Sequence, residues 1–313
     1  MLASLPPAAS PPPRLGYCCI NLSMGEKFRT MTLSWARSRP DEWLKRWKEV
    51  VSHNFSLLTR IIEWNAEAGI RLFRISSDLV PFADHPEYGL PWRRARRFRT
   101  GWWHRSILPA STALTGAMSR GSRFTMHPPQ FVSLGSPNPK VRRSSVSNLE
   151  YHAALMDDLG LPRSLESPIN IHVGNGTRPV PTAPLVRASL NRLSQSVRSR
   201  LVFENEQSGY WTPSSLMRAF PEVPVTLDYH HLLLNPDPVM TVESIEEHLI
   251  VQWGSFRPVC HWSEGRTQRL DPAHSEYVGP PPPCPFDIEV EAKGKDLAVL
   301  RLMQAVADHS LAT

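Results

Sequence analysis

Six short apolar runs of this chain end in or near a histidine, aspartate or glutamate, the side chains that most often bind divalent cations with nitrogen and oxygen ligands. The runs begin at positions 123, 168, 200, 223, 257 and 287, and the residues in question are His127, His172, Glu204, Asp228, His261 and Glu291. His231 and His274 follow in the segments just after the fourth and fifth of these runs. Six candidate ligands therefore lie at or near the ends of apolar runs, and two more follow shortly after such runs.

This ligand set predicts more than one cation. Eight nitrogen and oxygen ligands without a thiolate exceed what a single tetrahedral ion needs. Two or three divalent ions are implied, and a carboxylate such as Glu204 can bridge two of them. Ions held about 3.5 to 4 Å apart form the arrangement that cleaves phosphoesters by in-line displacement.

Each residue taken alone has a simpler interpretation. A single histidine at a strand end is more often a hydrogen-bonded structural residue, because an imidazole readily satisfies buried partners. Six separate strand ends that carry His, Asp or Glu are hard to obtain from packing needs, since barrel strands favour Val, Ile and Leu. We therefore predict a metal site.

The elements that must position these ligands alternate along the chain. Two further β-rich runs begin at Arg14 and Ile70, which makes eight, and helical stripes of apolar residues separate the runs. One such stripe comprises Leu44, Trp47, Val51, Phe55, Leu58 and Ile62, with Gly69 as its expected C-terminal cap. Repeated βα units indicate a parallel sheet, whose strand ends converge on one face when it closes.

We therefore predict an α/β fold, a single (β/α)₈ TIM barrel over residues 14–308 with a multi-metal site at its C-terminal rim. Residues 1–13 are expected to form a disordered Pro/Ala-rich N-terminal tail and residues 309–313 a C-terminal tail. Residues 93–120 and 177–186 fit the repeat poorly and are expected to be loops or broken helices. A loop from Val278 is expected to precede the eighth strand.

Composition narrows the class of protein. The chain has 313 residues, of which 41% are hydrophobic, and no apolar run approaches the roughly 18 to 20 residues that cross a bilayer. The N-terminus lacks the pattern of a secretory signal, and four cysteines form neither a disulfide framework nor a CxxC zinc motif. We expect a soluble protein of the reducing cytoplasm, used at the nucleoid.

The net charge of +6 is unevenly distributed. Five arginines lie between positions 93 and 99, and Trp102, Trp103, His104 and Arg105 follow closely. Basic residues interleaved with aromatics suit a polyanion, because they attract phosphates and offer flat rings to bases. A charge run is, however, more often a solvated face.

Long motifs at the same residues resemble the UV damage endonuclease family. They are RLGYCCINLS at Arg14, MHPPQFVSLGSPNP at Met126, IHVGN at Ile171, FENE at Phe203, LDYHH at Leu227, CHWSEG at Cys260 and EAKGK at Glu291. They occur in the family's order and cover residues 14 to 307. The resemblance implies a barrel related to the apurinic-site endonuclease and xylose isomerase superfamily.

The resemblance also implies about three divalent ions, commonly Mn²⁺, with Mg²⁺, Co²⁺ or Zn²⁺ as alternatives. Carried over by motif, His127, His172 and Glu204 would hold one ion. Glu204, Asp228, His261 and Glu291 would hold a second, and His231 with His274 a third. Glu204, Asp228, Glu291 and His261 are the predicted catalytic residues. His85 is a further candidate, although it is equally well explained as a loop histidine.

The family recognises distorted DNA, and its lesion-probing motif falls on Gln130 and Phe131. Phe131 replaces the family's common Tyr, which keeps the ring and its stacking but puts a hydroxyl contact in doubt; it could also be a core residue. Tyr17 and Asn21 match positions near the family's lesion pocket, although Asn after a strand is often a turn former. Some members carry a modified lysine where this chain has Val259, so we predict no such modification and altered occupancy of one ion.

The resulting hypothesis is metal-dependent hydrolysis of damaged double-stranded DNA by a monomer, immediately 5′ of UV photoproducts. Cyclobutane dimers and 6-4 photoproducts are the expected lesions, and abasic sites a second substrate. One alternative keeps the metals but makes the protein a sugar isomerase or epimerase of the same superfamily. The other is a module that binds damaged DNA without cleaving it.

Overall fold

The eight β-rich runs each form a short strand in the computed structural model of the chain, which describes residues 12–174 and 179–312, and their side chains except at 179–181 and 307–312. The strands are β1 Leu15–Cys18, β2 Leu72–Ile75, β3 Arg123–Met126, β4 Ile169–His172, β5 Leu201–Glu204, β6 Val225–Asp228, β7 Val259–Trp262 and β8 Asp287–Val290. Every strand pairs in parallel with the next, and β1 closes against β8. The predicted TIM barrel is therefore confirmed.

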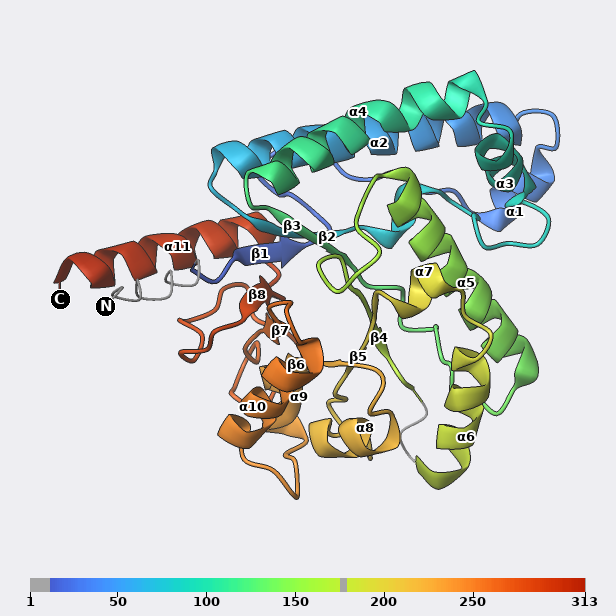
Figure 1. The fold of residues 1–313 in the computed structure, drawn as a ribbon. Coiled ribbons are helices and arrows are strands. Elements are labelled where there is room, and N and C mark those ends of the chain that lie inside the picture. The colour runs from blue at the N-terminus through green and yellow to red at the C-terminus, as the bar shows by residue number, and fades with distance from the viewer. Residues whose placement is uncertain (1–11, 175–178, 313) are drawn as a thin grey trace, which may run out of the picture.

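Helices surround the barrel and cover its strands (Figure 1). They are α1 Leu33–Ser38, α2 Trp43–Glu67, α3 Leu90–Arg97, α4 Gly101–Ser119, α5 Pro139–Asp158, α6 Pro179–Leu190, α7 Gln195–Arg198, α8 Pro213–Ala219, α9 Tyr229–Leu234, α10 Val242–Trp253 and α11 Lys295–Ala312, with a 3₁₀ turn η1 Ser77–Leu79. Within the described ranges, no helix is both long and apolar enough to cross a membrane.

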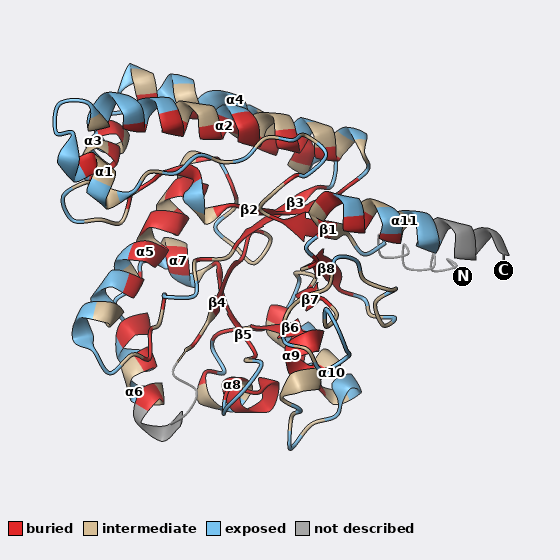
Figure 2. Cartoon of the chain, turned by 180° about the vertical axis from the view of Figure 1, so that it is seen from behind, coloured by how far each residue is buried: buried red, intermediate tan, exposed pale blue. Residues whose placement is uncertain are grey.

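The helical stripe predicted for residues 44–62 forms α2 and packs as expected. Trp47, Val51, Phe55 and Leu58 are fully buried, because residues three and four apart share the helix face that meets the barrel. Gly69 follows the helix with φ 76°, a backbone conformation that glycine adopts without strain. Figure 2 shows the result throughout the molecule: the strands and inner helix faces are buried, and the outer faces are exposed.

The two segments that fitted the repeat poorly are helical. Residues 93–120 form a broken helical region, in which α3 ends at Arg97 and α4 begins after the capping hydroxyl of Thr100. Of the two expected alternatives, loops or broken helices, the structure shows the broken helix, and Trp92 and Trp103 bury their rings under it rather than exposing them. Burial also removes these rings from any stacking role toward bases.

Residues 179–190 form one helix, α6, so the loop or broken helix expected over 177–186 was wrong for residues 179–186; positions 177 and 178 lie outside the described residues. Pro179 and Pro181 occupy the first turn, where a missing N–H is harmless. The loop from Val278 is confirmed, since residues 278–286, all of them described, form neither helix nor strand before β8. At the C-terminus, α11 continues to Ala312, through most of the segment expected as a tail. Residues 1–11 of the expected N-terminal tail lie outside the described residues.

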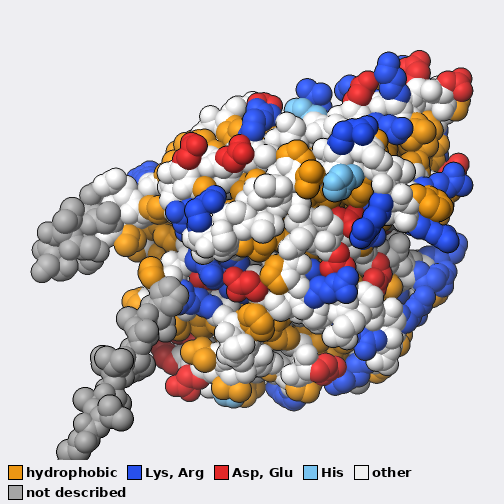
Figure 3. Space-filling view, turned by 45° about the horizontal axis from the view of Figure 1, so that its top comes forward, with side chains coloured by type: hydrophobic (Ala, Val, Ile, Leu, Met, Phe, Trp, Pro, Cys, Tyr) orange, Lys and Arg blue, Asp and Glu red, His pale blue; other side chains and the backbone are white. Residues whose placement is uncertain are grey.

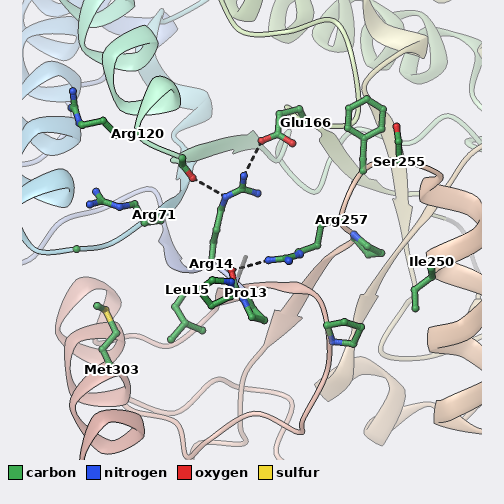
Figure 4. Close-up of a pocket in the computed structure, with 16 residues that line it drawn as sticks. Pro13, Arg14, Leu15, Arg71, Arg120, Glu166, Ile250, Ser255, Arg257 and Met303 are labelled. Carbon is green, nitrogen blue, oxygen red and sulfur yellow. Dashed lines mark hydrogen bonds and ion pairs between the residues drawn. The ribbon is translucent and has the colours of Figure 1, made fainter. Parts of the chain in front are cut away.

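A buried ionic cluster closes the N-terminal mouth of the barrel around Asp287, the first residue of β8. Its carboxylate lies 2.7 Å from Arg14, 2.8 Å from Arg123 and 3.5 Å from Arg257. The side chains of Asp287 and Arg123 are inaccessible to solvent. Figure 4 shows Arg14 reaching toward Glu166 and Arg257 lying beside it, along the wall of a cavity of about 860 Å³.

Asp287→Asn is expected to destabilise the fold by about 3 to 5 kcal/mol, because it leaves the Arg123 guanidinium buried without its counter-charge. Glu166→Gln is the matched control: Glu166 is partly exposed, and an exposed ion pair contributes about 1 kcal/mol or less. Equilibrium unfolding in urea measures both. A loss below about 1 kcal/mol for Asp287→Asn would contradict the role given to this cluster.

Candidate metal centre

The parallel barrel brings the predicted ligands to one mouth. His172, Glu204 and Asp228 are the last residues of β4, β5 and β6. His261 lies within β7, and His127 and Glu291 come one residue after β3 and β8. Since all strands run in the same direction, these positions share the C-terminal rim.

Glu204 lies at the centre of the cluster, and its two carboxylate oxygens face different imidazoles. Oε2 is 3.1 Å from Nε2 of His127 and 3.7 Å from Nε2 of His172. Oε1 is 3.3 Å from Nδ1 of His231 and 3.1 Å from Nδ1 of His261. A carboxylate placed in this way can serve two neighbouring ions at once.

Asp228 and Glu291 extend the cluster around His261. The Nδ1 atom of His261 lies 3.4 Å from Glu291 Oε1 and 3.9 Å from Asp228 Oδ2, and Nδ1 of His231 lies 3.7 Å from the same Asp228 oxygen. The ligand atoms form three groups in which all lie within 4.8 Å of one another. These groups are His127, His172 and Glu204; Glu204, Asp228 and His231; and Asp228, His261 and Glu291.

The donor atoms themselves indicate that the site fits a divalent cation. Asp228 Oδ2 and His261 Nδ1 are buried and have no hydrogen-bond partner within the described structure, and the same is true of His172 Nδ1. Buried polar atoms are rarely left unpaired, and coordination to a cation would satisfy the first two of these. Carboxylate and imidazole donors without thiolates suit Mn²⁺, Mg²⁺ or Zn²⁺.

The electrostatics keep the central carboxylate ionised. Burial alone would raise the pKa of Glu204, but the imidazoles of His172 and His261 and a hydrogen bond with His127 hold it well below its usual range. Burial raises the pKa of Asp228, with Glu204 and Glu291 adding to the effect and His231 opposing it. A nearby cation would favour the charged form of Asp228 as well.

Some residues of the centre were missed by sequence reasoning, because they lie one layer below the rim. Arg74 on β2 places its guanidinium 2.5 Å from both Glu289 and Glu291. Asn170 donates a hydrogen bond to Glu204 from two residues before His172. Glu289 and Asn170 could have been found by period-two alternation, because a residue two positions before a rim ligand points to the same side of its strand.

The resemblance pairs His231 with His274 on one ion, and this pairing stays a prediction. The imidazole of His231 lies beside Glu204 and Asp228, and its Nδ1 atom donates to the backbone carbonyl of Asn205 at 2.9 Å, which leaves Nε2 as its ligand atom. Nδ1 of His274 is 2.6 Å from the backbone carbonyl of Glu291 and 3.8 Å from its carboxylate. Because a carbonyl only accepts, that nitrogen donates, and Nε2 of His274 is left as its ligand atom.

The four residues predicted to contact the lesion divide into two pairs. Gln130 and Phe131 lie in the turn after β3, close to His127, and both are exposed, Phe131 by 64%. Phe131 is therefore not a core residue. Tyr17 and Asn21 are buried, with the Tyr17 hydroxyl donating to Asn65 and the Asn21 amide donating to Tyr17, so neither side chain reaches the surface.

His85 and Val259 also have simple structural surroundings. Nδ1 of His85 accepts backbone hydrogen bonds from Glu87 and Tyr88, as expected of a loop histidine, and His85 belongs to none of the three ligand groups found among the described residues. Val259 is a buried apolar residue of β7.

Comparison with known proteins identifies the family. A sequence model described as UV-endonuclease UvdE matches residues 13–312. The chain belongs to the UvdE family of UV endonucleases. The UV DNA damage endonuclease of Deinococcus radiodurans is 33% identical over 304 residues, which cover 93% of this chain and 95% of that protein.

Other members of the family are longer. The UV-damage endonuclease of Neurospora crassa is 33% identical over 269 residues, and that of Schizosaccharomyces pombe is 30% identical over 317 residues. The matches cover 79% and 92% of this chain but 39% and 50% of those two proteins, so the chain spans half or less of their length.

Solved structures share the fold. A crystal structure of SacUVDE superposes with a TM-score of 0.80 at 24% identity, covering 95% of this chain and 99% of that one. Endonuclease IV from Thermus thermophilus gives a TM-score of 0.55 at 16% identity, over 95% of this chain and 100% of that one. A D-psicose 3-epimerase from Clostridium cellulolyticum gives 0.51 at 12%, covering 81% and 92%. The barrel is thus common to enzymes with different names.

Adding Mn²⁺ to metal-stripped protein is expected to raise its Tm. At about 100 times Kd, one bound ion stabilises the folded state by about 2.7 kcal/mol, which corresponds to about 5 °C for a chain of this size. His172→Asn should lose part of this shift, whereas His248→Asn, an exposed histidine of α10, should keep all of it. Equal shifts in both variants, measured by differential scanning calorimetry, would argue against the ligand assignment.

Proposed function

We propose that this protein is a metal-dependent endonuclease that hydrolyses the phosphodiester immediately 5′ of UV photoproducts in double-stranded DNA, leaving a 3′-hydroxyl and a 5′-phosphate. Membership of the UvdE family and relatives named UV DNA damage endonucleases support the substrate class. The observation that carries the proposal is the buried Glu204 carboxylate, shared between four imidazoles at the mouth of the barrel. Cyclobutane dimers, 6-4 photoproducts and abasic sites are the proposed lesions.

Each ligand residue is assigned to one of three proposed ions. His127, His172 and Glu204 would hold one ion, and Asp228, His261 and Glu291 a second. A third would lie by His231 and His274, each of which would bind through Nε2 because its Nδ1 atom donates to a backbone carbonyl. When bound, divalent ions of this kind, most commonly Mn²⁺ in the family, acidify a water and stabilise charge on phosphoester oxygens.

Glu204, Asp228, Glu291 and His261 are the proposed catalytic residues: Glu204 and Asp228 each belong to two ligand groups, and His261 and Glu291 complete the group around Asp228. Glu204 is buried and held in its charged form by imidazoles, so it presents negative charge without a large rearrangement. Asn170 fixes the orientation of this carboxylate by donating to Oε2. The burial of Asp228 and His261 keeps bulk water away from the inner side of the centre.

Surface features around the mouth suit DNA. Arg94, Arg97 and Arg99 are exposed on and just after α3, and Lys140 and Arg143 are exposed on α5. Figure 3 shows Lys and Arg side chains concentrated on the right of the molecule, the side on which α1 and α3 lie in Figure 1. Such side chains provide sequence-independent attraction to phosphates. Phe131 offers an exposed ring near His127, which supports a contact with unstacked bases.

We propose that the chain acts as a monomer on DNA in the cytoplasm, at the nucleoid. Four free cysteines, two of them buried, fit a reducing compartment.

The epimerase alternative is supported only by fold, since the epimerase superposes at 12% identity. It predicts no salt-dependent binding to DNA, whereas a phosphate-binding enzyme weakens steeply as salt rises.

A duplex with one cyclobutane dimer should be nicked 5′ of the dimer by the protein and Mn²⁺. Glu204→Gln should lose at least about 100-fold in rate while folding normally, because even residues that only support a ligand cost up to that factor. Glu150→Gln, on the outer helix α5, is the control. Denaturing gel electrophoresis of end-labelled strands reports the nick. If the unaltered protein and Glu204→Gln bound the damaged duplex equally well and neither cut it, a binding module without catalysis would be the better description.

Phe131→Ala should weaken binding to the dimer-containing duplex relative to an undamaged one by about 5- to 150-fold, since stacking of a base on an aromatic side chain contributes about 1 to 3 kcal/mol. Val251→Ala removes a similarly exposed apolar side chain from the outer helix α10 and should change neither affinity. Fluorescence anisotropy measures both complexes. Unchanged discrimination in Phe131→Ala would exclude the ring as the lesion probe.

A further inference from the structure

A buried ionic group lies directly behind His261, on the side away from the rim ligands. Glu289 on β8 is the register partner of His261 on β7, so the two side chains point to the same face of the sheet. Glu289 Oε2 is 3.4 Å from Nε2 of His261 and 2.7 Å from Nε of Arg74, and Arg74 Nη2 is 2.7 Å from the same histidine nitrogen. All three residues are buried, with at most 7% of each exposed.

The two ring nitrogens of His261 face different partners. Nδ1 faces the carboxylates of Glu204, Glu291 and Asp228, which makes it the ligand atom. A neutral imidazole that binds a cation through Nδ1 carries its hydrogen on Nε2, and that hydrogen needs an acceptor. Arg74 has only donors, so its 2.7 Å contact with Nε2 in this structure corresponds to the other tautomer, with the hydrogen on Nδ1. Cation binding through Nδ1 therefore requires that Nε2 exchanges Arg74 for an acceptor.

Glu289 is the carboxylate within reach of Nε2. Its two oxygens have separate partners: the Thr125 hydroxyl hydrogen-bonds to Oε1, and Arg74 donates to Oε2. These contacts fix the orientation of the carboxylate beside the histidine ring. Arg74 also reaches Glu291 through Nη1 at 2.5 Å, so its guanidinium can remain paired without contacting Nε2.

We propose that Glu289 is a positioning residue for the metal centre: its carboxylate accepts the Nε2 hydrogen of His261 and thereby commits Nδ1 to cation binding. The inference rests on the proposed metal centre and deepens it by assigning a function to a residue outside the ligand groups. Carboxylates that orient a ligating histidine contribute about 10- to 100-fold to metal affinity. Loss of Glu289 should therefore weaken the ion held by Asp228, His261 and Glu291 and leave the ion at His127 and His172 bound.

The competing interpretation is that Glu289 only neutralises the buried Arg74, since removing one partner of a buried ion pair leaves an uncompensated charge. A double-mutant cycle separates the two interpretations. It compares Glu289→Leu, Arg74→Met and the double variant, with Mn²⁺ affinity of the full chain measured by electron paramagnetic resonance of the free ion. Asp157→Asn, which breaks an ion pair with the buried Arg200 on the outside of the barrel, controls for lost stability.

The positioning role predicts that Glu289→Leu weakens the binding of one Mn²⁺ by about 10- to 100-fold, both in the otherwise unaltered protein and in the Arg74→Met background. Glu289→Gln keeps an acceptor oxygen and should recover affinity to within a few-fold of the unaltered protein. If the double variant binds Mn²⁺ as tightly as Arg74→Met alone, Glu289 only neutralises Arg74 and the inference is overturned. If the unaltered protein binds no Mn²⁺ at all, the proposed metal centre itself fails.

Discussion

The structure depends on one electrostatic constraint, the burial of several carboxylates at the mouth of one barrel. Glu204, Asp228 and Glu289 are almost completely inaccessible, and Glu291 is partly buried. Negative charges in such a site repel one another and lose their hydration, which is unfavourable unless positive groups compensate them. Imidazoles and the Arg74 guanidinium provide part of that compensation, and divalent cations are the chemistry that completes it.

The barrel meets this constraint in two layers. The rim layer carries the imidazole and carboxylate ligands, each at or beside the end of a different strand. The layer below carries Asn170, which donates to Glu204, and Arg74, which contacts Glu291 and His261. Glu289 lies in the same layer and is oriented by Arg74 and Thr125. The opposite mouth is closed by a separate cluster on Asp287, so stability and chemistry are carried by different ends of the same strands.

Sequence reasoning predicted the barrel and the rim ligands because both follow from strand periodicity and a parallel arrangement. It could not predict that the Nδ1 atoms of His231 and His274 both donate to backbone carbonyls, because the backbone conformations after β6 and β7 decide this. It left open whether residues 93–120 form loops or a broken helix, since the arginine content hid the buried spacing of Trp92 and Trp103. It expected a loop or broken helix over 177–186, where three prolines hid the helix that begins at Pro179. Tyr17 and Asn21 were matched by motif, but a motif does not reveal that both side chains are buried and already hydrogen-bonded.

The most direct measurement is anomalous X-ray diffraction from crystals equilibrated with Mn²⁺. If divalent cations balance the buried carboxylates, strong anomalous peaks are expected at two places. One lies between His127 and Glu204, and the other between Asp228, His261 and Glu291, each within ordinary Mn²⁺ ligand distances of these side chains. Crystals that show no peak at the rim while the ligands keep their positions would contradict it. In that case the buried carboxylates are balanced by protons and imidazolium ions alone, and the centre has no cation with which to cleave DNA.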